Sequence, residues 1–234
     1  MKPHTVRKFD QQLDAIKQGI VTMGELAQQQ LAAALAALGE LDTARCEQII
    51  SDDRQLDDAM LKIENLVVDL LALRQPMADD LRMVIAALRG SRDLERIGDY
   101  AKNIARHTIT IARYPRHSAI DRLCNLSDPI HKMLVDAVSA YDTIDDDLAN
   151  QVRDQDAAID AEYTALFSAL LQEMEQGGIT PTLGTHLLFI ARCLERIGDH
   201  TTNLVEDVMF IAEGALPSDT RTQADQSYYT TGSD

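Results

Sequence analysis

The sequence Leu-Glu-Arg-Ile-Gly-Asp stands at residues 94–99 and returns, letter for letter, at residues 194–199. The surrounding residues agree as well, because Arg92 and Asn103 each have an identical counterpart 100 positions further along the chain. Chance repetition of six residues is improbable in a chain of 234 residues. The repeat therefore indicates an internal duplication, in which the two halves of the chain share one architecture.

Helical periodicity extends outward from both copies of the motif. Apolar residues recur every three or four positions through most of the chain, which is typical of amphipathic helices. The whole sequence holds only 11 Gly and 6 Pro, so connections should be few and helices long. Turn-forming residues divide the chain into six predicted helices, three in each half: 5–39, 42–73, 77–113, 127–143, 145–176 and 180–213.

Local signals set the predicted ends of these helices. Gly39 is a natural stop for the first helix, and Asp42 is a good N-cap for the second. In the second half, Ser127 is predicted to cap the fourth helix, with Pro129 in its first turn, and an earlier start of this helix is left open. The pair Thr180-Pro181 opens the sixth helix in the same way.

The fold class that follows is all-α, with two tandem three-helix bundles related by the duplication. The first bundle is predicted to cover residues 1–115 and the second residues 116–214, with the polar stretch 116–125 as the linker between them. Residues 215–234 are rich in Ser, Thr, Asp and Gln and show no periodicity. This composition predicts a disordered tail.

Charge and cysteine content exclude several classes of protein. The chain carries 22 Lys and Arg against 38 Asp and Glu, a formal net charge of −16, which argues against binding nucleic acid or anionic membranes. No export signal follows Met1, and no apolar run is long enough for direct insertion into a membrane. Cys46, Cys124 and Cys193 are far apart, so we expect reduced thiols and a cytoplasmic protein.

The repeated motif places two carboxylates one helical turn apart, beside the core-facing stripe of its helix. Glu95 and Asp99 are four residues apart, and Asn103 continues the same row. Neighbouring carboxylates repel each other, so some positive charge should offset them. One answer is a solvated network of ion pairs with Arg92 and Arg96, and the other is a bound cation.

Each half carries a second acidic pair, again with four-residue spacing, on its middle predicted helix. If the middle and last helices pack antiparallel, the two pairs of each half face each other and build an all-oxygen site. The candidate metal ligands are Asp53, Asp57, Glu95 and Asp99 in the first half and Asp156, Asp160, Glu195 and Asp199 in the second, with Asn103 and Asn203 as auxiliary residues. An oxygen-rich site without histidine pairs favours Mg, Mn, Ca or iron over zinc.

Two further features of the sequence bear on function. Gly98 and Gly198 sit inside predicted helices, where glycine is unfavourable, so they indicate either a close helix approach or simple inheritance from the duplication. Phosphate-binding loops, nucleophile motifs and dinucleotide-binding motifs are absent from the sequence, which argues against an enzyme.

The doubled motif, together with the segments 74–76, 80–82 and 103–105, resembles the PhoU family of phosphate-specific transport system accessory proteins. The segments read Arg-Gln-Pro, Asp-Leu-Arg and Asn-Ile-Ala, and the likeness covers about residues 5–213. The resemblance implies two three-helix bundles that often form homodimers. It also implies multinuclear metal clusters in some members, with ligands at the eight acidic positions named above, holding divalent ions or iron. The second half lacks the arginine segment at 74–82, so its role is not duplicated.

The resemblance further implies a cytoplasmic regulator of phosphate uptake. Members are thought to couple the ATPase subunit of the phosphate transporter to a phosphate-sensing histidine kinase, and to hold the phosphate-starvation response off when phosphate is plentiful. The alternative is a metal-binding helical module with a storage or sensing role. A carboxylate–metal hydrolase is a third, more remote reading.

Overall fold

The computed structural model describes residues 3–215, and the predicted tail beyond Ala215 lies outside them. The described chain forms seven α-helices and no strand. Their bounds are α1 Pro3–Glu40, α2 Thr43–Asp52, α3 Arg54–Arg74, α4 Asp79–Ile111, α5 Ala119–Thr143, α6 Asp146–Glu175 and α7 Pro181–Glu213.

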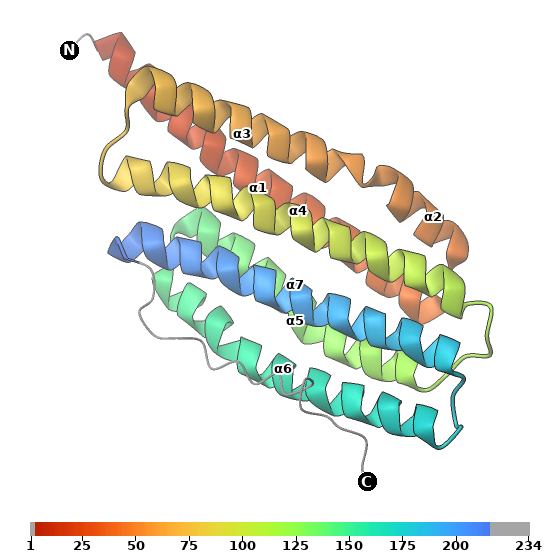
Figure 1. Ribbon diagram of the computed structural model, residues 1–234. Helices are drawn as coiled ribbons and strands as arrows, with labels where there is room; N and C mark the ends of the chain where they lie inside the picture. The colour runs from red at the N-terminus through yellow and green to blue at the C-terminus, as the bar shows by residue number, and fades with distance from the viewer. Residues whose placement is uncertain (1–2, 216–234) are drawn as a thin grey trace.

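The helices form two bundles that lie side by side (Figure 1). In one bundle α1, α3 and α4 pack together, with α2 continuing roughly along the line of α3, and in the other α5, α6 and α7 pack together. The two bundles meet along a central seam, where α4 packs on α7 and α1 packs on α5. The predicted all-α fold of two three-helix bundles is confirmed.

One hydrophobic core runs through both bundles, because the buried apolar residues of all seven helices form a single cluster. Leu94, Ile97 and Ala101 of the first motif helix are fully buried, as the predicted core-facing stripe requires. At the α1–α5 part of the seam the backbones come close. A Cβ atom on Gly24 would lie 2.5 Å from Val138, so only glycine fits this contact without a shift.

The second predicted helix is wrong in one respect, because it divides at Asp53 into α2 and α3. The Asp53 backbone keeps right-handed helical angles, with φ −52° and ψ −31°, so the chain bends here and does not turn back. The Asp53 side chain is held from two other helices, by Gln30 of α1 and Lys102 of α4. These contacts account for a break in a segment whose local sequence favours a continuous helix.

The fourth predicted helix does not begin at Ser127 but earlier, within the predicted linker, as the sequence had left open. Helix α5 begins at Ala119, eight residues before Ser127, and contains Pro129 in its interior. The Ser127 hydroxyl does not cap a helix but donates to the backbone oxygen of Cys124, 2.7 Å away, within the same helix. Burial of Ile120 and Leu123 offsets the unfavourable proline, because tertiary packing outweighs local propensity.

Three predicted N-terminal signals are confirmed and one C-terminal signal is wrong. The side chain of Asp42 accepts from the backbone N–H of Arg45, and the side chain of Thr180 accepts from that of Leu183. Pro181 stands in the first turn of α7. Helix α1 runs through Gly39 and ends at Glu40, and the left-handed residue that follows is Leu41, with φ 55°.

Candidate functional site

The acidic pairs of the first half face each other across the α3–α4 contact. We call Asp53, Asp57, Glu95 and Asp99 the first acidic cluster. Asp53 and Asp99 meet on one shared partner, the ammonium nitrogen of Lys102. Asp57 is near enough to Glu95 for its charge to act on the ionisation of that carboxyl. The predicted juxtaposition of the two pairs is therefore present, although a lysine stands between them.

Lys102 lies three residues after Asp99 on α4, and its side chain is only 14% exposed. Its Nζ lies 2.6 Å from Asp99 Oδ1 and also contacts Asp53 Oδ2. Burial lowers the pKa of Lys102, but the hydrogen bonds to Asp53 and Asp99 and their negative charges outweigh it and raise the pKa above its ordinary value. The amine therefore stays an ammonium ion at neutral pH.

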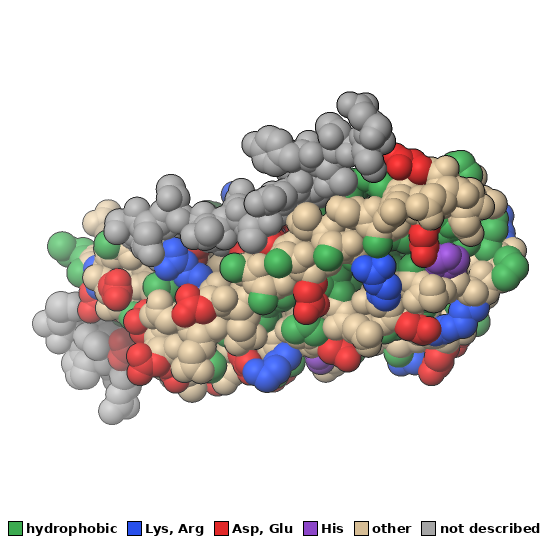
Figure 2. Space-filling view, turned by 90° about the horizontal axis from the view of Figure 1, so that it is seen from below, with side chains coloured by type: hydrophobic (Ala, Val, Ile, Leu, Met, Phe, Trp, Pro, Cys, Tyr) green, Lys and Arg blue, Asp and Glu red, His purple; other side chains and the backbone are tan. Residues whose placement is uncertain are grey.

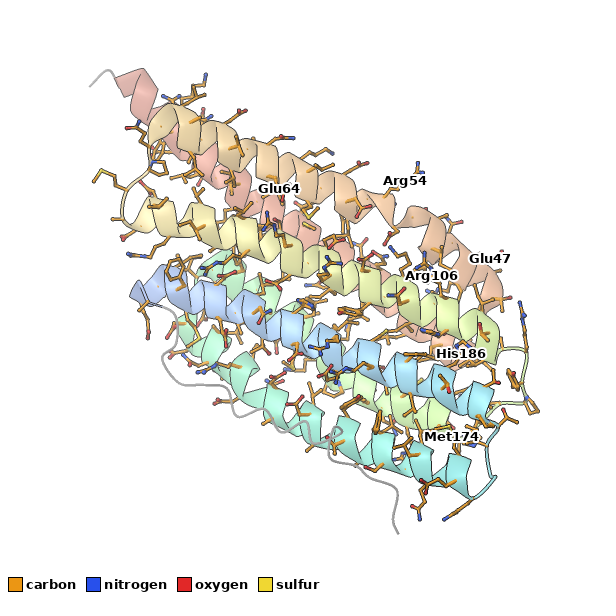
Figure 3. All side chains as sticks on the ribbon, in the orientation of Figure 1. Glu47, Arg54, Glu64, Arg106, Met174 and His186 are labelled. Atoms are coloured by element: carbon orange, nitrogen blue, oxygen red, sulfur yellow. The ribbon has the colours of Figure 1, made fainter. Side chains whose placement is uncertain are left out.

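The other carboxylate of the first motif, Glu95, is less well compensated. Burial, and then the negative charge of Asp99, raise the pKa of Glu95, and the positive charge of Arg96 opposes that rise. Arg96 bridges the pair, with its Nε 3.6 Å from Glu95 and a terminal nitrogen 3.2 Å from Asp99. Arg92 was expected to pair with Glu95 but binds Glu64 of α3 instead, at 3.4 Å. Glu64 lies between α3 and α4 (Figure 3).

The second half repeats the acidic arrangement in a more buried form. We call Asp156, Asp160, Glu195 and Asp199 the second acidic cluster. Asp156, Asp160 and Glu195 are each at most 6% exposed. Arg192 contacts Glu195 at 3.1 Å, and Arg196 contacts Glu195 at 3.5 Å and Asp199 at 3.0 Å. Both arginines of the motif thus pair with its carboxylates in the second half, whereas in the first half only Arg96 does.

The two auxiliary asparagines have different surroundings. Asn103 accepts a hydrogen bond from Arg106, one turn further along α4, at 3.2 Å. Asn203 donates to Asp93 of the other bundle, at 3.1 Å. The His200 side chain, which sequence spacing places beside Asp199, contacts the same Asp93 oxygen at 2.7 Å. Asn203 therefore belongs to the central seam.

The motif glycines also differ between the halves. A Cβ atom on Gly98 would lie 2.2 Å from Leu56, so α3 and α4 approach closely at this level. A Cβ atom on Gly198 would lie 3.6 Å from Asp156 Oδ1, which is an ordinary contact. The close-approach interpretation therefore holds for Gly98, and inheritance from the duplication is sufficient for Gly198.

Sequence reasoning missed a buried acid at the seam, Asp207 of α7, whose side chain is 3% exposed. Its Oδ1 lies 3.3 Å from a terminal nitrogen of Arg89 on α4. Burial raises the pKa of Asp207 from 3.8 to about 7, and Arg89 only partly opposes the rise. Burial and the nearby Asp207 also raise the pKa of Tyr141. Asp207 lies outside the repeated motif, so the repeat does not mark it. The sequence indicates this residue only as an acid among the apolar residues of the last predicted helix.

The donor set decides how well a metal ion fits these clusters. Among residues 8–215 no group of three or more His, Cys, Asp and Glu side chains has an arrangement that could hold a metal ion. In the first acidic cluster Lys102 already bridges Asp53 and Asp99, so these two of the four candidate ligands do not fit a metal as they stand. In the second, three of the carboxylates are buried and the position that matches Lys102 is Thr202, so metal binding there stays a prediction.

None of the described helices combines the length and the apolar character that a membrane span requires.

The PhoU domain family model matches the chain twice, at residues 20–108 and 123–208. These two matches follow the internal duplication and contain both acidic clusters.

Curated relatives cover nearly the whole chain. A "Phosphate-specific transport system accessory protein PhoU homolog" from Rhizobium meliloti (strain 1021) is 39% identical over 226 residues, which is 96% of this chain and 95% of the relative. A protein of the same name from Xylella fastidiosa (strain 9a5c) is 40% identical over 90% of this chain and 89% of the relative.

Solved structures agree with the fold. The crystal structure of PhoU from Pseudomonas aeruginosa matches with a TM-score of 0.84 and 31% identity, and the alignment covers 88% of this chain and all of that one. The phosphate transport system regulatory protein PhoU from Streptococcus pneumoniae matches with a TM-score of 0.82 and 29% identity, covering 90% of this chain and 99% of that one.

Proposed function

The chain belongs to the PhoU family, and from this premise we propose that it is a non-catalytic, cytoplasmic regulator of phosphate uptake. In this role it couples the ATPase subunit of a phosphate transporter to a phosphate-sensing histidine kinase and keeps the phosphate-starvation response off when phosphate is plentiful. The names of the relatives, which tie them to the phosphate-specific transport system, support the transporter side of this proposal.

One structural observation carries the proposal, namely an apolar surface on α3. We define the α3 apolar surface by six exposed side chains of α3 and of the loop that follows it: Leu61, Leu66, Val68, Leu71, Leu73 and Met77. Val68 is 61% exposed and Met77 is 79% exposed, yet among the described residues only Val135 and Phe189 are large, apolar and exposed elsewhere. Several large apolar side chains exposed on one helix are typical of a protein contact site.

A groove beside α3 extends this surface. It has a volume of about 540 Å³ and lies between α1 and α3, with Gly19 and Ile63 on its walls and Leu66 at its rim. Polar and charged side chains, among them Asp58 and Lys62, also line the groove, so it can accept an amphipathic helix of a partner. The loop after α3 also carries strained backbone, since Ala78 has φ 50° and ψ −118°. Strain of this kind is often kept where a segment presents side chains to a partner.

The second bundle lacks a counterpart of this surface. No large apolar side chain of α6, which takes the place of α3 in the duplication, is exposed in the described structure. Figure 2 views the molecule from the α6 side, where acidic and basic side chains are interspersed over the visible face. The asymmetry supports one docking face for the transporter ATPase on the first bundle.

Charge reversal on the α3 apolar surface tests the proposal. Val68→Glu and Leu61→Glu should abolish co-purification of the ATPase subunit and switch on phosphate-starvation genes in phosphate-rich medium, as deletion of the whole protein should. Val135→Glu on α5 is the matched control, because it adds the same charge at an exposed apolar position outside the surface. Normal regulation in the deletion strain would refute the regulatory role. Normal ATPase capture by folded Val68→Glu would refute this surface as the contact.

The second candidate function is metal binding by the second acidic cluster, and burial of Asp156, Asp160 and Glu195 favours it. Carboxylate oxygens are the ligands that divalent cations such as Mg²⁺ and Mn²⁺ prefer in proteins. Elemental analysis of protein purified without chelator tests this function. The Mg, Mn or Fe content should fall in Glu195→Gln, and equal content in both proteins would count against the cluster.

We also propose that the protein forms a homodimer. Light scattering on the purified protein tests this proposal.

A further inference from the structure

We propose that the side chain of Lys102 is the permanent cation of the first acidic cluster, and that this cluster therefore excludes metal ions. The inference concerns the metal-binding candidate alone and does not depend on the regulatory role. It rests on the placement of one ammonium group and on the absence of that group from the matching position of the repeat.

Two carboxylates hold the ammonium group, and a third helix holds one of these carboxylates. Its Nζ contacts Asp53 at the start of α3 and Asp99 on α4. The other Asp53 oxygen accepts from the amide nitrogen of Gln30 on α1, at 3.4 Å, and that same amide nitrogen lies 3.4 Å from the backbone oxygen of Gly98. Both carboxylates and the amine are therefore fixed by hydrogen bonds, and the site is complete as it stands.

A metal ion that bridged Asp53 and Asp99 would need the place that Nζ occupies. Mg²⁺ binds carboxylate oxygens at about 2.0–2.1 Å, and Ca²⁺ at about 2.3–2.6 Å. Lys102 Nζ is already 2.6 Å from Asp99 Oδ1. A divalent ion and an ammonium ion cannot share these oxygens, because two positive charges at such short separations repel each other strongly in a partly buried site.

The repeat shows the same site without the lysine. The residue 100 positions after Lys102 is Thr202, whose buried hydroxyl donates to the backbone oxygen of Gly198 at 3.1 Å. In the second half the corresponding arginine, Arg192, turns toward Glu195, whereas Arg92 turns away to Glu64. The second cluster thus uses Arg192 as a partner of Glu195, whereas the first cluster uses Lys102, which contacts carboxylates at the start of α3 and on α4.

The inference predicts that removal of the lysine creates a metal site. Lys102→Thr introduces the residue of the repeat and should add at least one equivalent of bound Mn²⁺ per chain in calorimetric titration. Asp99→Asn alone should bind as much Mn²⁺ as the wild-type protein. The double variant Lys102→Thr/Asp99→Asn should lose the equivalent of Mn²⁺ that Lys102→Thr gains. Lys132→Thr is the matched control, because it deletes an ammonium group that pairs with Asp136 on an exposed face.

Two results would overturn the inference. One is a loss of bound Mn²⁺ when Asp53→Asn or Asp99→Asn is made with Lys102 present, since that would make the first cluster a metal site already. The other is a folded Lys102→Thr protein that binds no more Mn²⁺ than the Lys132→Thr control. If Lys102→Thr does not fold by circular dichroism, Lys102→Met, which keeps the apolar stem, gives the same comparison.

Discussion

His200 on α7 places its Nδ1 atom 2.7 Å from Oδ1 of Asp93 on α4, so a hydrogen bond joins the two bundles across the central seam. Asn203, one turn further along α7, donates to the same oxygen at 3.1 Å. The ring of His200 also lies against Tyr100, with ring centroids 5.7 Å apart. Asp93 is therefore a shared acceptor that fixes the register of α4 against α7.

A double-mutant cycle on this pair should measure their coupling. Asp93→Ala and His200→Ala should each lower the free energy of unfolding, and the cycle should give a coupling of about 1–3 kcal/mol, since the bond is partly buried and one partner is a carboxylate. Urea denaturation of the four proteins provides the measurement. A coupling below about 0.3 kcal/mol would mean that the two residues act independently.

The two motif glycines should respond in opposite directions to the same substitution. Gly98→Ala forces Leu56 out of a packed position and should destabilise the protein by about 1–3 kcal/mol. Gly198→Ala meets only ordinary contacts and should stabilise by up to about 1 kcal/mol through helix propensity. Each variant is the control for the other in thermal or urea denaturation. Equal shifts in the two proteins would contradict the difference in packing.

Asp207 should make the protein less stable as pH rises. Because the pKa of its carboxyl is about 7 when folded and near 3.8 when unfolded, the folded state binds more protons between these values. The stability that Asp207 contributes is present at low pH and is lost as pH rises, by up to about 1.4 kcal/mol per pH unit. Asp207→Asn should therefore be more stable than wild type at about pH 8 but not at about pH 4.

The control for this experiment is Asp128→Asn, because Asp128 is an exposed carboxylate on α5. Urea denaturation at several pH values should show a pH-dependent stability difference for Asp207→Asn and a flat difference for Asp128→Asn. A flat difference for Asp207→Asn would mean that Arg89 keeps the carboxyl ionised in the folded protein.

The three thiols should differ in reactivity. Burial raises the pKa of Cys46 to about 11 and that of Cys193 to about 12, and both side chains are inaccessible. Burial also raises the pKa of Cys124, but this side chain is partly exposed. Ellman's reagent should therefore titrate Cys124 first in the folded protein and all three thiols in guanidinium. Cys124→Ser is the control, and rapid reaction of that variant would contradict the burial of the other two.

The fold could be predicted because its strongest signals are local or repeated. The hexapeptide at 94–99 and 194–199 revealed the duplication, and periodic apolar residues such as Leu94 and Ile97 revealed the core-facing stripe. Caps such as Asp42 carry their partner three residues away, so sequence shows both members of the contact. The break at Asp53 and the early start of α5 depend on partners far along the chain, which local patterns do not show.

The candidate site was predictable only in part for the same reason. The four-residue spacing of the acidic pairs placed them on facing helices, and the structure brings the two pairs of the first half together. Lys102 was not predictable from the repeated letters, because the two repeats differ at this position, where the second half has Thr202. Its partner Asp53 lies 49 residues away, so no local pattern joins the two.

The close contact between Gly24 and Val138 has a consequence for how the molecule unfolds. Since α1 and α5 touch here while α4 and α7 touch at the other side of the seam, each bundle supplies a wall of the other's interior. The two halves should then lose structure in one cooperative transition, with no stable half-folded species. Although the chain arose from two copies of one unit, the two copies should therefore unfold together, and neither should stay folded without the other.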